Sequence, residues 1–218
     1  MGCRAWTAFS LTKTQMPSNP AIRGIIFDLD GTLVDSKLDF EAIRRDMGLP
    51  SQTPILEALQ RTAPGPDLER MHAVLHSHEL RSAELATLFD GVVEFLQWVD
   101  EQPWQRAVLT RNSRICTDLV LGRLKLQFSH VLTREDAAPK PDPEGLLAIC
   151  RAWNLRPDEV VFCGDYLFDL QAGRRAGMRT ILFAPGPVPD FADQADFVLR
   201  TFQSAAVDLR TWLAGVTS

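Results

Sequence analysis

The sequence predicts an α/β protein: a Rossmann-like parallel sheet core with helices on both faces and an inserted small helical cap. From residue 90 onward, short apolar runs alternate with segments of helical periodicity, which is typical of a parallel sheet covered by helices on both faces. Between residues 37 and 86 the helical pattern continues without a strand-like run. We therefore expect residues 24–36 and 87–218 to form the core, 37–86 the cap, and 1–23 a disordered tail.

The first strand is expected at residues 24–28, where a continuous apolar run indicates a buried strand. Three cap helices should follow, because apolar residues recur at helical spacing in three groups. These groups are Leu38, Ile43 and Met47; Ile55, Leu56 and Leu59; and Leu68, Met71, Leu75 and Leu80. The first helix should end at Gly48-Leu49-Pro50, the second at 63–66, and Asp67 is the expected N-cap of the third.

The rest of the chain should supply the other strands and helices of the core. Strands are expected at 107–109, near 130–132, and at 160–163, 180–183 and 196–199; helices are expected at about 91–101, 113–124, 143–153, 167–176 and 203–214.

The composition is that of an ordinary globular protein, with 45% hydrophobic and 23% charged residues in 218. Residues 1–23 carry three basic residues and no acid, so residues 24–218 hold 20 basic and 28 acidic residues, a net charge of -8. Such an acidic body argues against nucleic acid as a partner. Local cations would have to attract an anionic substrate.

Three features bear on location. The four cysteines form no C-x-x-C pair, which favours a reducing compartment. No apolar run approaches the ~20 residues of a membrane span, so no membrane partner is expected. We expect a cytoplasmic protein, although the acid-free residues 1–23 would also suit an organelle transit peptide. The oligomeric state stays open.

Two carboxylates directly follow the first strand. Asp28 and Asp30 are two residues apart, and side chains at that spacing share a face while the backbone stays extended. Their mutual repulsion requires a cation, a shared proton or separate roles. This arrangement indicates a reactive site.

Polar residues also follow the later strands. Thr110-Arg111-Asn112-Ser113 follows the second core strand, Lys140 lies between two prolines after the third, and Asp165 and Asp169 follow the fourth. Ligands of parallel sheets bind beyond the carboxyl ends of the strands. The sequence therefore brings acids, a hydroxyl group and one lysine to the same edge.

This set of groups suits phosphoryl chemistry. A phosphoryl group in transfer carries negative charge on its peripheral oxygens and needs cations and donors around it. Thr110 offers a hydroxyl group and Lys140 a point charge. Carboxylate oxygens suit Mg²⁺, and Asp165 could hold that ion together with Asp28.

The four segments, beginning with Asp28-Leu29-Asp30-Gly31-Thr32, resemble in order the four motifs of the haloacid dehalogenase-like superfamily. The resemblance covers roughly residues 24–185 and is to the phosphatase branch with a helical cap. Its narrower style is similar to that of phosphoglycolate phosphatases. It implies a Mg²⁺-dependent phosphatase that acts on a small phosphorylated metabolite.

The resemblance also implies roles for individual residues. Asp28 would be the nucleophile that forms an aspartyl phosphate, and Asp30 the general acid and base. Thr110, Arg111 and Lys140 would bind the phosphoryl group. The metal site would comprise Asp28, Asp30 through its backbone carbonyl, Asp165 and Asp169.

Simpler roles remain open for some of these residues. Thr110 could cap the helix at 113, Lys140 could be a solvated loop charge, and Asp169 could complement a helix dipole. Arg111 and Asn112 could contact substrate or support their loop. His72 and His76 share a helix face but match no zinc motif, so an exposed helix face is the preferred interpretation.

Other activities of the superfamily are weighed by residue type. The dehalogenases lack the second aspartate, which is present here as Asp30. Phosphosugar mutases typically carry Val where Thr32 stands, so Thr32 favours a phosphatase over a mutase. A catalytically silent binding protein on this fold is the remaining alternative.

The cap is expected to set specificity in this branch. The loop 48–51 is the candidate to reach the site, and Arg44, Arg45 and Arg61 are candidates to meet a second anionic group.

Overall fold

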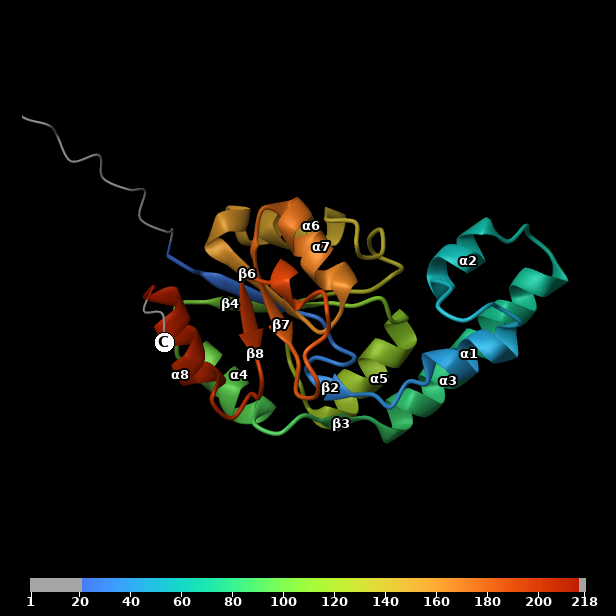
Figure 1. Cartoon of the computed structure of the whole chain (residues 1–218), viewed down its shortest axis with the longest axis horizontal. Helices are drawn as coiled ribbons and strands as arrows, with labels where there is room; N and C mark the ends of the chain where they lie inside the picture. Colours follow the sequence, from blue (N-terminus) through green and yellow to red (C-terminus); the bar gives the residue numbers. More distant parts are fainter. Residues whose placement is uncertain (1–20, 216–218) are drawn as a thin grey trace, which may run out of the picture.

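The computed structural model describes residues 21–215, and a six-stranded parallel sheet lies at its centre (Figure 1). The strand order is β5-β4-β1-β6-β7-β8, and every neighbouring pair is parallel. The strands are β1 (Gly24–Phe27), β4 (Gln105–Leu109), β5 (His130–Leu132), β6 (Val160–Gly164), β7 (Arg179–Phe183) and β8 (Phe197–Leu199).

Helices cover both faces of this sheet because the strands are apolar on both faces. Ile25 and Phe27 pack into one core cluster and Ile26 into the other, as the alternation of strand side chains requires. The first face carries α4 (Val92–Asp100), α5 (Arg114–Leu124) and α8 (Ala205–Leu213); the second carries α6 (Glu144–Trp153) and α7 (Leu167–Ala176). Figure 1 shows α6 and α7 on the opposite side of the sheet from α4 and α8. The predicted α/β class is confirmed.

Three helices follow β1 and project away from the sheet (Figure 1): α1 (Phe40–Met47), α2 (Ile55–Arg61) and α3 (Pro66–Leu85). They share an apolar cluster of their own, which is separate from the clusters on the sheet: Ile43, Met47, Ile55, Leu59, Met71 and Leu75. We call residues 37–86 the cap.

The ends of the cap helices have local causes. Asp39 caps α1, since its side chain accepts a hydrogen bond from the N–H of Ala42 at 2.9 Å, and Gly48 ends that helix in the left-handed conformation. The sequence predicted Asp67 as the N-cap of α3, and this prediction is wrong. Gly65 occupies that position and Pro66 begins the helix, because proline suits the first helical turn.

A two-stranded antiparallel ribbon joins the cap to the core. It pairs β2 (Val34–Asp35) with β3 (Thr87–Leu88), with Val34 opposite Leu88 and Asp35 opposite Thr87. The sequence did not reveal this ribbon, because two residues are too few to show a strand alternation. Short 3₁₀ helices at η1 (Pro157–Glu159) and η2 (Ala192–Gln194) complete the fold.

Residues 1–20 of the predicted tail lie outside the described residues. Arg23 continues the backbone pairing of β1: its N–H donates to the carbonyl of Glu159 at 2.8 Å, and its carbonyl accepts from Gln105 at 2.9 Å. Among residues 21–215, no helix is both long enough and apolar enough to cross a membrane. Cys116, Cys150 and Cys163 are buried free thiols.

Candidate active site

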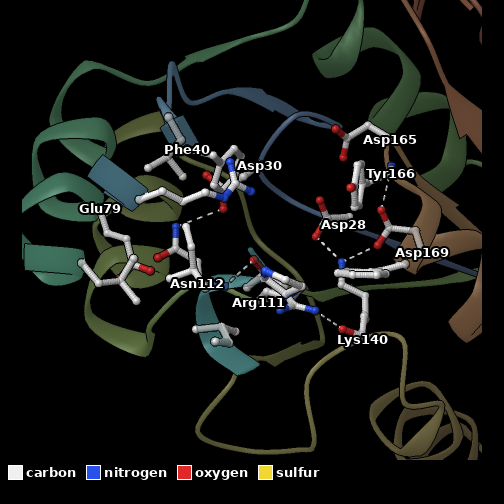
Figure 2. A pocket seen from close by; sticks show the side chains of 18 of the residues that line it. Asp28, Asp30, Phe40, Glu79, Arg111, Asn112, Lys140, Asp165, Tyr166 and Asp169 are labelled. Atoms are coloured by element: carbon white, nitrogen blue, oxygen red, sulfur yellow. Dashed lines mark hydrogen bonds and ion pairs between the residues drawn. The ribbon is translucent and has the colours of Figure 1, made fainter. Parts of the chain in front are cut away.

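The polar residues converge where the strand order reverses. β1 lies between β4 and β6, and the crevice beside such a reversal is the usual ligand site of an open parallel sheet. Asp28 follows β1, Thr110 follows β4 and Asp165 follows β6. All three line one cavity of about 340 Å³, and Figure 2 shows Asp28 and Asp165 among the lining side chains.

Lys140 lies at the centre of the site. Its Nζ donates to Asp28 Oδ1 at 2.5 Å and pairs with Asp169 Oδ1 at 2.6 Å, as Figure 2 shows. The Lys140 side chain is only 3% exposed, so it is not a solvated loop charge. Burial alone would lower the pKa of Lys140, but the carboxylates of Asp169 and Asp28 outweigh burial and raise that pKa to about 12. The lysine therefore stays charged at any physiological pH.

Three carboxylates gather beside this lysine. Oxygens of Asp28, Asp165 and Asp169 lie within 4.8 Å of one another. Burial, followed by repulsion from Asp169, raises the pKa of Asp165 to about 7. Burial also raises the pKa of Asp28 well above its usual value, with Lys140 opposing and Asp169 and Asp165 adding to the shift. A divalent cation fits this donor set, since carboxylate oxygens are ligands that Mg²⁺ prefers and its charge would offset the repulsion.

Asp169 also holds the start of α7. Its Oδ2 accepts a hydrogen bond from the N–H of Tyr166 at 3.0 Å, as in a capping box. The other oxygen of the carboxylate pairs with Lys140. The residue therefore serves the helix end and the site at once, so the two roles that the sequence offered for it are compatible.

The turn after β1 brings the backbone against Asp165. Gly31 has φ +86°, and a Cβ at this position would lie 2.4 Å from Asp165 Oδ2. Thr32 is fully buried, and its hydroxyl group donates to Asp165 Oδ1 at 3.3 Å. Gly31 and Thr32 thus set the position of a candidate metal ligand.

Asp30 lies apart from the three clustered carboxylates. Its Oδ2 accepts from Asn112 Nδ2 at 3.0 Å (Figure 2), while its Oδ1 is buried with no hydrogen-bond partner in the part of the chain that the structure describes. Burial raises the pKa of Asp30, and the hydrogen bond from Asn112 only partly opposes that shift. A carboxyl group with a raised pKa and a free oxygen is suited to carry a proton.

The loop after β4 is held by its own side chains. The Thr110 hydroxyl oxygen accepts from the N–H of Asn112 at 3.0 Å, and Asn112 Oδ1 accepts from the N–H of Ser113 at 2.8 Å. Ser113, not Thr110, is the N-cap of α5. Thr110 is therefore free of that capping role, and Asn112 connects the loop to Asp30.

Arg111 reaches toward the cap. Its Nη2 lies 2.9 Å from both carboxylate oxygens of Glu57 on α2, and its Nη1 donates to the carbonyl of Lys140. The guanidinium carbon lies 4.9 Å from the centre of the Phe168 ring. The sequence predicted Arg111 as a site residue but did not predict Glu57 as its ion-pair partner.

A second ion pair joins cap and core beside the cavity. Glu79 on α3 is buried and pairs through both carboxylate oxygens with Arg134, at 3.0 Å for Oε2. Burial raises the pKa of Glu79, and Arg134 opposes that rise. Glu79 was missed from the sequence, because a charged residue in an amphipathic helix usually faces water.

Residues from core and cap line the cavity together. The core contributes Asp28, Asp30, Thr110, Arg111, Asn112, Lys140, Asp165, Tyr166, Phe168 and Asp169; residues 38–79 contribute Leu38, Phe40, Arg44, Gln52, Pro54, Ile55, Leu56, Leu75 and Glu79. All seven predicted site residues are thus brought together around one cavity.

The expected cap contacts are corrected in part. Gln52 and Pro54 line the cavity instead of loop residues 48–51. Arg44 lines it, whereas Arg45 and Arg61 are exposed and do not. His72 and His76 are exposed on α3 and belong to no candidate metal cluster among residues 21–215.

Comparisons with known proteins point to one family. A family model for haloacid dehalogenase-like hydrolases matches residues 36–183; this range includes Thr110, Lys140 and Asp165 but begins after Asp28 and Asp30. A haloacid dehalogenase-like hydrolase domain-containing protein of Arabidopsis thaliana is 29% identical over 187 residues, which are 80% of this chain and 76% of the relative.

A bacterial relative and a solved structure extend this result. The N-acetylmuramic acid 6-phosphate phosphatase of Pseudomonas putida is 32% identical over 181 residues, 73% of this chain and 81% of that protein. The crystal structure of a hydrolase from Pseudomonas syringae covers 90% of this chain and all of its own, with a TM-score of 0.70 at 22% identity. The structural likeness supports the fold.

Proposed function

Since the chain belongs to the haloacid dehalogenase-like hydrolases, we propose that it is a Mg²⁺-dependent phosphatase that hydrolyses a small phosphomonoester through an aspartyl phosphate. One observation carries this proposal: the buried Lys140 lies between Asp28 and Asp169, beside Asp165, at the switch point of the sheet. That arrangement would supply the proposed nucleophile, a fixed cation and a candidate metal site within one cavity.

In the proposed first step, an oxygen of Asp28 attacks phosphorus and the bond to the leaving oxygen breaks. Lys140 holds the Asp28 carboxylate and provides positive charge for the phosphoryl oxygens. Thr110 offers its hydroxyl group. Arg111 lines the same cavity, and phosphate binding would compete with Glu57 for its guanidinium.

Asp30 moves the proton in both steps. Its raised pKa favours the carboxyl form, which can protonate the leaving oxygen. The resulting carboxylate then takes a proton from the water that attacks the aspartyl phosphate, which releases inorganic phosphate and restores Asp28. Asn112 keeps Asp30 oriented through its hydrogen bond.

The proposed Mg²⁺ site comprises Asp28, Asp165 and Asp169, together with the backbone carbonyl of Asp30. The bound ion would supply positive charge that keeps the carboxylates ionised and stabilises the charge on the phosphoryl group. Gly31 and Thr32 would position Asp165 for this role.

We propose residues 37–86 as a cap that opens and closes over the core, which comprises residues 24–36 and 87–218. Its separate apolar cluster and the two-residue strands at its ends support this division. The hinges would lie near 34–37 and 86–90. Closure would exclude water from the first step and opening would admit substrate.

The test is phosphate release from phosphorylated metabolites with Mg²⁺ and with a chelator. Release should require the metal, and Asp28→Asn should abolish it. In Asp30→Asn, a substrate with a good leaving group, such as 4-nitrophenyl phosphate labelled on phosphorus, should leave label trapped on Asp28. Label elsewhere, or turnover by Asp28→Asn, would refute the assigned roles. An isomeric phosphosugar as product would identify a mutase.

A further inference from the structure

We infer that the substrate's leaving group is uncharged and carries an apolar, preferably aromatic, part. The inference deepens the phosphatase proposal and rests on it. It concerns the part of the cavity lining that the cap contributes. It names a substrate class that differs from phosphate esters with a carboxylate in the leaving group, such as phosphoglycolate.

The charged groups that face this portion of the cavity are already neutralised. Arg44 donates from Nη1 to Glu41 Oε1 at 2.7 Å and from Nε to the carbonyl of Thr53 at 2.9 Å. Arg111 pairs with Glu57, and Glu79 pairs with Arg134.

The only other cation lining the cavity, among residues 21–215, is Lys140. It is occupied by Asp28 and Asp169 and would serve the phosphoryl group. A second anionic group on the substrate would therefore meet no unpaired cation. It would have to displace Glu41 from Arg44 or Glu57 from Arg111, so its gain is offset by the ion pair that it breaks and by the acid that it leaves unpaired beside its own negative charge.

The remaining lining of this portion is largely apolar. The cap contributes Leu38, Phe40, Pro54, Ile55, Leu56 and Leu75, with Gln52 as the uncharged polar member, and the core adds the rings of Tyr166 and Phe168 to the lining of the same cavity. Burial of apolar area in such surroundings stabilises a complex by roughly 25 cal/mol per Å². An apolar leaving group would gain this energy, and a carboxylate would not.

Two aromatic side chains are exposed at the cavity. Phe40 is 51% exposed and Tyr166 is 53% exposed, and Figure 2 shows them apart, with Asp28 between them in that view. The Tyr166 ring meets the Phe168 ring edge to face, at 5.2 Å between centroids. A ring on the substrate could pack against either surface, because aromatic pairs favour stacked and edge-to-face contacts.

The cavity size fits a small molecule with one ring. Its volume of about 340 Å³ lies at the lower end of the range for small-molecule sites, roughly 300–1,000 Å³. A phosphoryl group fills only a part of it. The substrate class is thus a phosphate ester of a small apolar or aromatic alcohol.

The test compares benzyl phosphate with phosphoglycolate. Both release a primary alcohol, but the alcohol carries an aromatic ring in the first compound and a carboxylate in the second. With Mg²⁺ present, kcat/KM should be at least tenfold higher for benzyl phosphate. Leu56→Arg places an unpaired cation in the cavity and should shift this ratio toward phosphoglycolate by tenfold or more. The matched variant Leu56→Met should leave the ratio within about threefold.

Arg44→Gln tests the alternative that this arginine binds an anion. The ratio should stay within about threefold of the wild-type value. A selective loss of phosphoglycolate turnover would overturn the inference, as would an equal or reversed preference in the wild-type protein.

A binding measurement separates this inference from the proposed function. Calorimetry with Mg²⁺ should show tighter binding of benzylphosphonate than of phosphonoacetate, whether or not any ester is turned over. If no phosphomonoester is hydrolysed, the phosphatase proposal fails, and binding alone decides whether the cavity prefers an apolar part to a carboxylate on its ligand. Equal binding, tighter binding of phosphonoacetate or binding of neither compound would overturn the inference.

Discussion

At the scale of single residues, Gly31 is a backbone position that fixes a candidate metal ligand. A Cβ there would lie 2.4 Å from Asp165 Oδ2, and φ is +86°. Gly48 offers a matched comparison, because its φ is +77° but a Cβ would meet no atom within 4 Å. A side chain at either position would strain the backbone to a similar degree, but only a side chain at Gly31 would displace Asp165.

We therefore predict that Gly31→Ala lowers Mg²⁺ affinity and phosphate release by tenfold or more, while Gly48→Ala leaves both near the wild-type values. Gly48→Ala should lose about 1 kcal/mol of unfolding free energy, the usual cost of a left-handed conformation, and Gly31→Ala should lose more because its Cβ also meets Asp165. Metal titration and denaturant unfolding measure the two effects. Equal metal affinity in both variants would show that Gly31 does not position Asp165.

The raised pKa of Asp165 gives a pH dependence with a defined sign. Folding raises this pKa from 3.8 to about 7, so between these values the folded protein holds a proton that the unfolded chain has lost. The unfolding free energy must then fall as pH rises through that window. Above about pH 7 both states are deprotonated and this contribution is constant.

For the metal-free protein we predict a decline in thermal stability between pH 5 and pH 7.5 that is smaller in Asp165→Asn, which has no carboxyl group to titrate. Saturating Mg²⁺ should reduce the decline in the wild-type protein, because the bound cation favours the ionised form. Unfolding scans with chelator and with Mg²⁺ at both pH values measure this. An identical pH dependence in the two proteins would contradict it.

The grouping of the polar site residues could be predicted from the sequence, but the hydrogen-bond partners that hold them could not. Asp28, Asp30, Lys140 and Asp165 could be placed together because each follows a strand of one parallel sheet. The partners Asn112 for Asp30 and Glu57 for Arg111 depend on how segments distant in sequence pack. Sequence periodicity carries no information on such pairings.

At the scale of elements, the two ion pairs that join cap and core differ in burial. The side chains of Glu79 and Arg134 are 6% and 18% exposed, whereas those of Glu57 and Arg111 are 27% and 22% exposed. The end of α3 is also held to α5, because Arg123 donates to the carbonyls of Ala83 and Ala86. We therefore expect the Glu79–Arg134 pair on α3 to stay closed and the Glu57–Arg111 pair on α2 to open.

Two isosteric variants test this difference. Glu79→Gln should cost roughly 1–3 kcal/mol of unfolding free energy, because it removes the buried carboxylate that accepts from Arg134 and leaves that arginine with the longer ion pair to Glu135 at 3.7 Å. Glu57→Gln should cost about 0–1 kcal/mol, as expected of a more accessible pair.

Hydrogen exchange should report the consequence for motion. Glu57→Gln should speed exchange in α1 and α2 and leave α3 near its wild-type rate. Equal stability losses in the two variants, or faster exchange confined to α3, would mean that the roles of the two pairs are reversed.

The helices and main strands followed from the sequence to within a few residues, since each has clear periodicity. The ribbon of β2 and β3 did not, because each strand has two residues. The N-cap of α3 was misplaced because Asp67 is a good capping residue, whereas Pro66 at the first helical position determined the start.

At the scale of the whole molecule, the acidic body opposes an anionic substrate. Residues 24–218 carry a net charge of -8, and the candidate site holds three clustered carboxylates beside one lysine. The overall field should repel a phosphomonoester, and only the contacts within the cavity attract it.

We predict that kcat/KM rises about twofold when the KCl concentration increases from 10 to 200 mM at saturating Mg²⁺, because salt screens the long-range repulsion. Steady-state kinetics with a neutral-leaving-group ester measure it, with solvent viscosity held constant. A steep fall in kcat/KM would instead reveal a positive field that steers the substrate.

The pairing of Asp35 with Thr87 has a consequence for how this protein can diversify. The chain leaves and re-enters the core at adjacent points, since neighbouring strands lie roughly 5 Å apart. A different insert with neighbouring ends could therefore be grafted there without altering the sheet or its carboxylates. Changes of substrate can then arise by exchange of a single module, while the reaction chemistry is inherited unchanged.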